Sequence, residues 1–184
     1  MATDGPSIKR IMPLRGEPPH ILGVRRRMTA TQLIADGYAL FSAFPRPDHF
    51  HDRLDGESED HEATLQARDL GTLELNDVAC IGYNPITAIE PEGMAYFFPK
   101  LVELALDMES RSGYENEPYL CDFLSQIRTG PSERRFSLFS SKHIQFVCRF
   151  VRFVGEKYMA HIEKRFYAEE FNAALEGWCV ECDT

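Results

Sequence analysis

The chain has 184 residues, of which 43% are hydrophobic and 27% charged, and its formal net charge is −9. This length and composition suit one domain with its own core and exclude disorder over the whole chain. An acidic chain also argues against general nucleic-acid binding by the domain, because neutralising phosphates requires a basic surface. No apolar run approaches the roughly 20 residues that cross a bilayer, so we expect no membrane span.

The first 27 residues differ from the rest of the chain. They contain Pro6, Pro13, Pro18 and Pro19, six basic residues and two acidic ones, so this segment carries +4 and the remainder −13. Few apolar positions recur at helical spacing here. We therefore predict a flexible basic arm over 1–27, which could contact acidic surfaces such as nucleic acid or a membrane.

Helix signals begin directly after the arm. Thr29, followed three residues later by Gln32, has the form of a capping box, and apolar residues at helical spacing predict a helix over 31–43. Pro45 and Pro47 end this helix, since proline lacks an amide donor. Ser58 is the expected N-cap of a short helix with acidic residues in its first turn, where they meet the positive end of the helix dipole.

The middle of the chain is less regular. The segment 71–89 shows no clear period, although 85–89 could form a short extended piece. Pro91 opens a helix whose apolar stripe reaches Met108, and Pro99 inside it predicts a kink or two short helices. A further helix is expected over 119–127.

The C-terminal third reads as two helices. Ser140 or Ser141 can cap a long helix that is apolar on most sides, and another helical stretch reaches Leu175. Strand signals are scarce. We expect an all-α protein: a single irregular helical domain over 28–178 with about five to six helices, long loops and at most minor strands, followed by a tail over 179–184.

The segment 45–62 is the densest in charge and in histidine. Seven carboxylates so close together repel one another unless a cation, a basic partner or solvent compensates their charge. We take these residues as candidates for binding a partner: Asp48, Asp52, Asp55, Glu57, Glu59, Asp60 and Glu62.

Three histidines in this segment, His49, His51 and His61, are candidate ligands for zinc or another divalent metal ion, with carboxylates as further ligands. The spacing is not that of a structural zinc site, and the alternative, that the histidines are solvated or hydrogen-bonded loop residues, is favoured. Ser140, Ser141 and His143 fit a helix start better than a catalytic triad. We therefore assign no catalytic residue and favour a protein that is not an enzyme.

Five cysteines, at positions 80, 121, 148, 179 and 182, are an odd number in a chain that shows no apolar signal-peptide core. We expect a cytoplasmic protein without structural disulfides. The pair Cys179 and Cys182 has redox spacing, but it ends the chain rather than opening a helix, so an exposed thiol pair is the simpler interpretation.

Three segments, 44–50 (FPRPDHF), 60–65 (DHEATL) and 91–101 (PEGMAYFFPKL), together resemble a family of small uncharacterised bacterial proteins, a domain of unknown function. The similarity spans residues 33–175 and implies a bacterial, cytosolic setting. Many members carry a Cys-x-x-Cys before the second motif. Here Asp55 and Ser58 stand at those positions, so the thiolate metal site that the resemblance would imply is absent.

Two functions remain open from the sequence. The first is a non-enzymatic binding protein whose acidic segment engages a basic protein partner, for example as an immunity or antitoxin-like inhibitor, since complementary charge speeds association. The alternative is a metal-binding domain or metal-dependent enzyme that uses the region of His49, His51 and His61.

Overall fold

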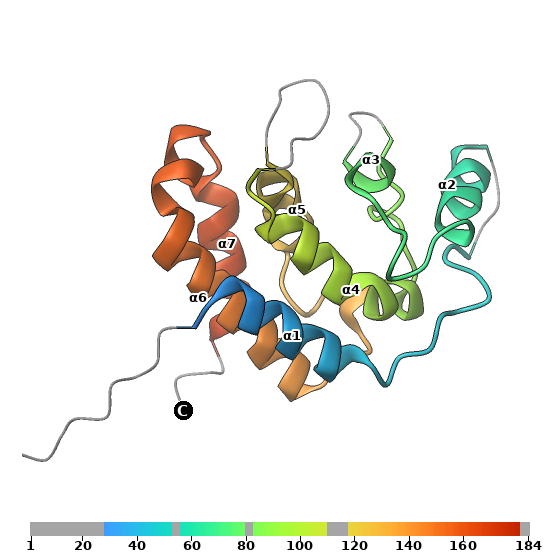
Figure 1. Ribbon diagram of the computed structural model, residues 1–184, viewed down its shortest axis with the longest axis horizontal. Coiled ribbons are helices and arrows are strands. Elements are labelled where there is room, and N and C mark those ends of the chain that lie inside the picture. The colour runs from blue at the N-terminus through green and yellow to red at the C-terminus, as the bar shows by residue number, and fades with distance from the viewer. Residues whose placement is uncertain (1–27, 53–55, 80–82, 110–117, 181–184) are drawn as a thin grey trace, which may run out of the picture.

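The computed structural model describes residues 28–52, 56–79, 83–109 and 118–180 (Figure 1). These residues form helices and no β-strand, which confirms the expected all-α single domain. The arm over 1–27, residues 181–184 of the tail and the candidate Asp55 lie outside the described residues. In chain order the helices are α1 (Ala30–Phe41), α2 (Glu57–Gln66), α3 (Leu75–Val78), α4 (Pro91–Leu106), α5 (Tyr119–Ile127), the 3₁₀-helix η1 (Arg134–Phe136), α6 (Ser141–Lys164) and α7 (Ala168–Cys179).

Helix starts follow local signals at two of three predicted caps. Thr29 caps α1 and accepts a hydrogen bond of 3.1 Å from the amide of Gln32. Ser140 caps α6 in a capping box with His143. The predicted cap at Ser58 is wrong, because the N-cap of α2 is Gly56, two residues earlier. Gly56 has a φ of 53°, a left-handed conformation that glycine adopts without steric cost.

Helix α4 lies at the centre of the core and packs against α1, α5 and η1. Its aromatic side chains Phe97 and Phe98 are fully buried, and Phe98 stacks on Phe41 of α1 with ring centroids 5.1 Å apart. The helix continues through Pro99, so the alternative of two short helices is wrong. Pro99 is buried, and its packing offsets the backbone hydrogen bond that proline removes.

The segment before α4 differs from its prediction. The short helix α3 lies in the part that showed no clear period, and Glu74 and Asp77 form its capping box. The extended piece expected over 85–89 is wrong, because these residues form a turn in which the amide of Thr87 donates to the carbonyl oxygen of Asn84 at 3.1 Å. Asn84 precedes a proline, and such pairs favour turns.

Helices α6 and α7 form a hairpin and pack along each other. Trp178 of α7 is buried and donates from its indole nitrogen to the carbonyl oxygen of Ile127 at 2.7 Å. The close approach of α7 to the residues after α5 depends on two glycines. A Cβ atom at Gly177 would lie 3.0 Å from the Cα atom of Gly130. In the connection between the two helices, Phe166 is 91% exposed and has a φ of 65°.

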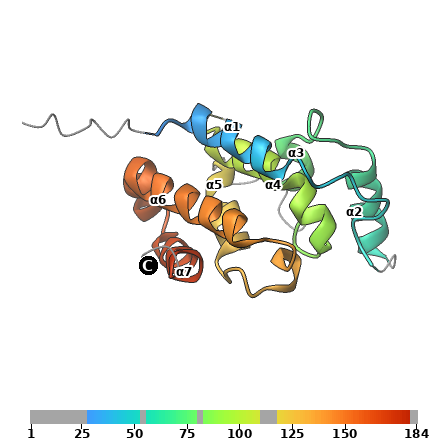
Figure 2. The same ribbon diagram turned by 90° about the horizontal axis from the view of Figure 1, so that it is seen from below.

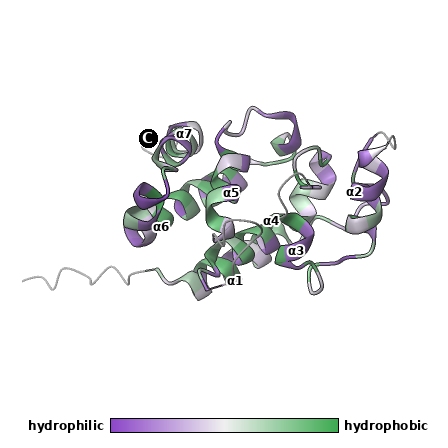
Figure 3. Ribbon diagram, turned by 90° about the horizontal axis from the view of Figure 1, so that it is seen from above, coloured by the Kyte–Doolittle hydropathy of each residue, from purple (hydrophilic) through white to green (hydrophobic). Residues whose placement is uncertain are grey.

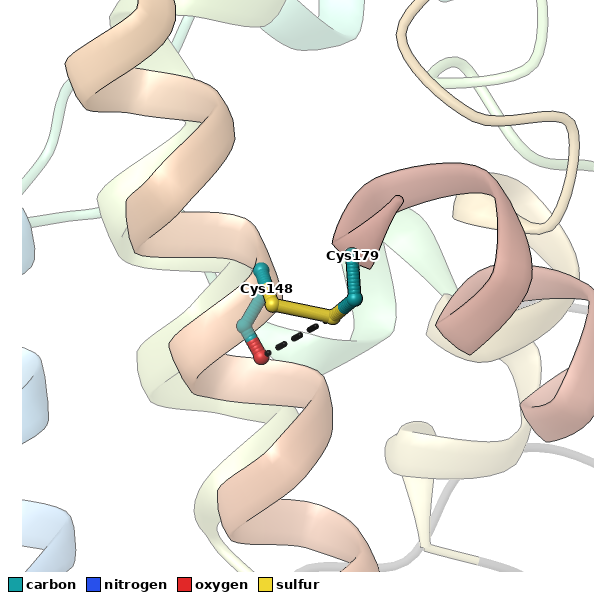
Figure 4. Close-up of a disulfide and its surroundings, with 2 residues drawn as sticks. All are labelled: Cys148 and Cys179. Carbon is teal, nitrogen blue, oxygen red and sulfur yellow. Dashed lines mark hydrogen bonds between the residues drawn. A yellow bond between two sulfur atoms is a disulfide. The ribbon is translucent and has the colours of Figure 1, made fainter. Parts of the chain in front are cut away.

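A disulfide joins Cys148 of α6 to Cys179 of α7 (Figure 4), and our prediction of no structural disulfide is therefore wrong. The packing of the two helices brings the Cα atoms of these residues to 5.0 Å, although 31 residues separate them in sequence. Cys179 is buried, so it is not part of an exposed thiol pair. Figure 4 also marks a 3.7 Å contact from the sulfur of Cys179 to the carbonyl oxygen of Cys148, a hydrogen bond that only the reduced thiol can donate.

Helix α2 stands at one end of the molecule and the α6–α7 hairpin at the other, in two perpendicular views (Figures 1 and 2). Figure 3 shows that α2 is largely hydrophilic, in contrast to the hydrophobic α4. Only His61, Glu62 and Leu65 of α2 are buried. In the part of the chain that the structure describes, no helix is both long and apolar enough to cross a membrane.

Candidate functional site

The carboxylate of Glu62 in α2 joins this helix to residues 49–51. Its Oε2 atom accepts hydrogen bonds from the amides of Phe50 and His51, at 2.9 and 3.0 Å, and lies 3.2 Å from Nδ1 of His51. Its Oε1 atom accepts from Gln66 at 3.0 Å and lies 3.3 Å from Nδ1 of His49. Burial raises the pKa of Glu62, but these hydrogen bonds outweigh burial and bring the pKa below its ordinary value of 4.5.

His51 extends this network to the turn before α4. The ring is buried, and its Nε2 atom lies 3.0 Å from the carbonyl oxygen of Pro85. The other ring nitrogen faces Glu62, so both neighbours are hydrogen-bond acceptors. His51 thus connects α2 with the turn over 85–88, and it acts as a structural link.

The structure brings the three candidate metal ligands near one another but uses them differently. His49 and His51 each contact the carboxylate of Glu62. The ring of His61 lies next to that of His51, with ring centroids 5.9 Å apart. Among the described residues, no three His, Cys, Asp or Glu side chains are grouped so that they could hold a metal ion. The metal site remains a prediction that no observed geometry favours.

The described carboxylates among the predicted partner-binding residues divide into three groups. Glu62 is buried and points inward, so its assignment to a binding surface is corrected. Asp52 is exposed but pairs with Arg134 at 2.8 Å. The other described members of the set are exposed, and no described lysine or arginine forms a salt bridge with them. We call these four the acidic surface: Asp48, Glu57, Glu59 and Asp60.

Sequence reasoning missed the role of Arg134. This residue of η1 lies 82 positions after Asp52, yet its guanidinium group contacts both Asp52 and Glu90, the residue that precedes α4. It holds Asp52 against the start of α4. The only sequence signal is the pair Arg134 and Arg135 in an acidic chain. This pair does not indicate which carboxylates form ion pairs with Arg134.

A hollow of about 410 Å³ lies between the first turn of α2 and the turn over 83–88. Glu57 and His61 line it from α2, and Tyr83 and Ala88 line it from the facing turn. A larger hollow of about 600 Å³ lies between α1 and α6, but there Asp36 and Arg149 pair with each other at 3.3 Å. The hollow beside α2 is lined by Glu57, a member of the acidic surface.

Comparison of the sequence with protein-family models and with curated proteins, and of the structure with solved structures, gives no match. The resemblance of the motifs at 44–50, 60–65 and 91–101 to a bacterial family remains an expectation.

Proposed function

We propose that this protein is a non-enzymatic binding protein whose acidic surface engages a basic protein partner. One observation carries this proposal. The carboxylates of the acidic surface lie within residues 48–60 and have no described lysine or arginine in salt-bridge contact, whereas Asp36, Asp52 and Asp77 each pair with an arginine of the chain. Their mutual repulsion is relieved by a partner of opposite charge.

The anchor beneath the surface supports the same proposal. Glu62 holds the backbone of Phe50 and His51, and His51 in turn contacts Pro85, so residues 50 and 51 are joined to α2 and to the turn over 85–88 before any partner arrives. A surface that is already ordered loses less conformational entropy on binding. Complementary charge then raises the association rate and disfavours acidic partners. An inhibitor of a basic toxin that acts on nucleic acid is one form of such a protein.

The test begins with affinity purification from cells of the source organism, identification of the captured proteins, and calorimetry with each purified candidate. The first variant replaces the acidic surface, and a matched control removes the same charge from the opposite end of the molecule, where α6 and α7 carry four exposed glutamates. The acidic-surface variant is Asp48→Asn, Glu57→Gln, Glu59→Gln and Asp60→Asn. The control variant is Glu156→Gln, Glu163→Gln, Glu169→Gln and Glu176→Gln.

We expect the first variant to bind a basic partner about tenfold more weakly, with a shallower salt dependence, while the control stays close to the wild type. Tenfold is about 1.4 kcal/mol, or roughly 0.35 kcal/mol for each exposed carboxylate, within the usual range for surface pairs. Equal losses in both variants would show that only net charge matters. An unchanged affinity in the first variant would refute the proposed site.

A further inference from the structure

The side chain of His143 closes the start of α6. Its Nδ1 atom accepts a hydrogen bond of 3.1 Å from the backbone amide of Ser140, the N-cap of the helix, and lies 2.8 Å from the Oγ atom of the same serine. The serine side chain in turn accepts from the backbone amide of His143. Capping boxes usually carry Glu or Gln at this position, where a side-chain oxygen accepts from the N-cap amide. A histidine accepts there only through a nitrogen that carries no proton.

The ring of His143 also contacts the end of α1. A hydrogen bond to the backbone of Leu40, in the last turn of that helix, favours a proton on the ring. Since Nδ1 accepts from the amide of Ser140, this proton is on Nε2. The surroundings thus select one neutral tautomer, and the same side chain contacts both the end of α1 and the start of α6.

Three phenylalanine rings pack around His143. Phe41 ends α1, Phe44 lies in the turn after it, and Phe139 precedes α6; their ring centroids lie 4.7, 5.2 and 5.8 Å from that of His143. Phe41 and Phe139 are buried, and Phe41 stacks on Phe98 of α4. The imidazole ring therefore lies at the edge of the aromatic core, where α1 meets α6.

A second proton on the ring would break this arrangement. A protonated Nδ1 is a donor, and it cannot accept from the amide of Ser140, which is itself always a donor. The Oγ atom of Ser140 can accept from the protonated nitrogen, so that contact survives with reversed roles, but the amide loses its partner. The added charge would also lie in the first turn of a helix of 24 residues, where the positive end of the helix dipole disfavours a cation.

The groups around the ring do not compensate such a charge. The only charged residue of α1 is Asp36, and its carboxylate pairs with Arg149 at 3.3 Å. The neighbouring charge on α6 is the exposed Lys142, which has the same sign as a protonated imidazole. The three residues after α1, like 136–140 before α6, include no charged side chain. Burial lowers the pKa of His143 below its ordinary value of 6.5 and outweighs the hydrogen bond to α1, which raises it.

We propose that His143 is a pH-sensitive switch that joins α1 to the start of α6 while its ring is neutral and releases them when the ring is protonated. Release frees the first turn of α6 and uncovers the edges of Phe41 and Phe139. The contribution of the neutral ring is complete above about pH 6.5 and is lost as the pH falls through the lower, folded-state pKa of His143. The switch lies on α1 and α6 and not on α2, so it does not depend on the proposed function.

Nuclear magnetic resonance of the ¹⁵N-labelled protein tests the switch between about pH 7.5 and about pH 5. The ring nitrogens report the tautomer and the pKa of His143, and hydrogen exchange reports the protection of the Ser140 amide. We expect no proton on Nδ1 at the upper pH. The protection factor of the Ser140 amide should fall about fivefold, as the loss of a helix cap implies, with the same midpoint as the titration of the ring. A proton on Nδ1 at the upper pH, or protection that does not follow the ring titration, would overturn the inference.

Two variants separate His143 from the other titrating groups. His143→Gln forms an ordinary capping box that does not titrate, so the protection of the Ser140 amide should no longer change over this pH range. His49→Gln removes an exposed histidine beside α2 and is the control, which should keep the pH dependence of the wild type. A pH dependence that persists in His143→Gln, or that disappears in His49→Gln, would overturn the inference. Circular dichroism checks that both variants fold, and the titration of the wild type decides alone if one does not.

Discussion

Replacing Glu62 by glutamine tests whether this carboxylate anchors the acidic segment. A glutamine side chain has the same shape, but one oxygen becomes an NH₂ group. In one orientation that group faces two donors, the amides of Phe50 and His51; in the other it faces the donor side chain of Gln66 and Nδ1 of His49, which can donate or accept. With about 1.5 kcal/mol for each hydrogen bond lost to a charged acceptor, the free energy of unfolding should fall by roughly 1.5–3 kcal/mol, and Tm by roughly 3–12 °C.

Urea denaturation provides the assay, with two probes of unfolding. The single tryptophan, Trp178, is buried in α7 at the end of the molecule opposite α2, so its fluorescence reports global unfolding. Circular dichroism reports all helices, and an early loss of ellipticity in the variant would show local unfolding of α2. Glu59→Gln is the matched control, and it should change stability by less than about 0.5 kcal/mol because its side chain is exposed.

The pH dependence gives a second criterion. The pKa of Glu62 in the folded protein lies below its ordinary value of 4.5, so the contribution of the carboxylate to stability is complete above about pH 4.5 and is lost as the pH falls through the lower, folded-state pKa. The difference between wild type and Glu62→Gln should therefore shrink on acidification below pH 4.5. A loss under about 0.5 kcal/mol at neutral pH, or a difference that grows in acid, would refute the reasoning.

Three further changes have expected outcomes that denaturation and chemical labelling can check. Arg134→Gln breaks the ion pairs of an exposed guanidinium group with Asp52 and Glu90 and should lower stability only slightly, and less at high salt; a loss as large as that expected for Glu62→Gln would contradict this. Gly177→Ala should destabilise by about 1–3 kcal/mol although alanine favours helices, because its Cβ atom would meet the backbone at Gly130; Asn172→Ala, exposed on the same helix, is the control, and a stabilised Gly177→Ala variant would refute the close approach. Reduction of the disulfide, which closes a loop of 31 residues, should lower stability by about 3–4 kcal/mol. Before reduction, alkylation of the unfolded protein should leave Cys148 and Cys179 unmodified, and modification of both would contradict the bond.

Local signals predicted the helices well. The span 119–127 matches α5, and Thr29 and Ser140 cap α1 and α6 as expected. Such signals depend on residues three or four positions apart, which a sequence displays directly. Pro99 shows their limit, because a local rule allowed two short helices here and the structure has one helix that continues through this buried residue.

The contacts that organise the site could not be predicted in this way. Glu62 and Asp48 belong to the same acidic segment, yet one is buried among hydrogen-bond donors and the other is exposed. The amino-acid composition of the segment does not distinguish these two carboxylates, because only the folded chain determines which side chain points inward. The contact between Arg134 and Asp52 and the bond between Cys148 and Cys179 likewise depend on which helices pack together. Tyr83, which forms a wall of the hollow, had no signal in the sequence beyond its proximity to Asn84 and Pro85.

The bond between Cys148 and Cys179 also turns the α6–α7 hairpin into a covalent ring. The exposed connection at Phe166 lies inside this ring, and exposed connections are where proteases cut. A single chymotryptic cut after Phe166 would leave the two pieces joined, so a denaturing gel would show one band without reductant and two bands with it. An oxidising compartment would thus keep a nicked copy of the protein in one piece, whereas a reducing compartment would let α7 separate.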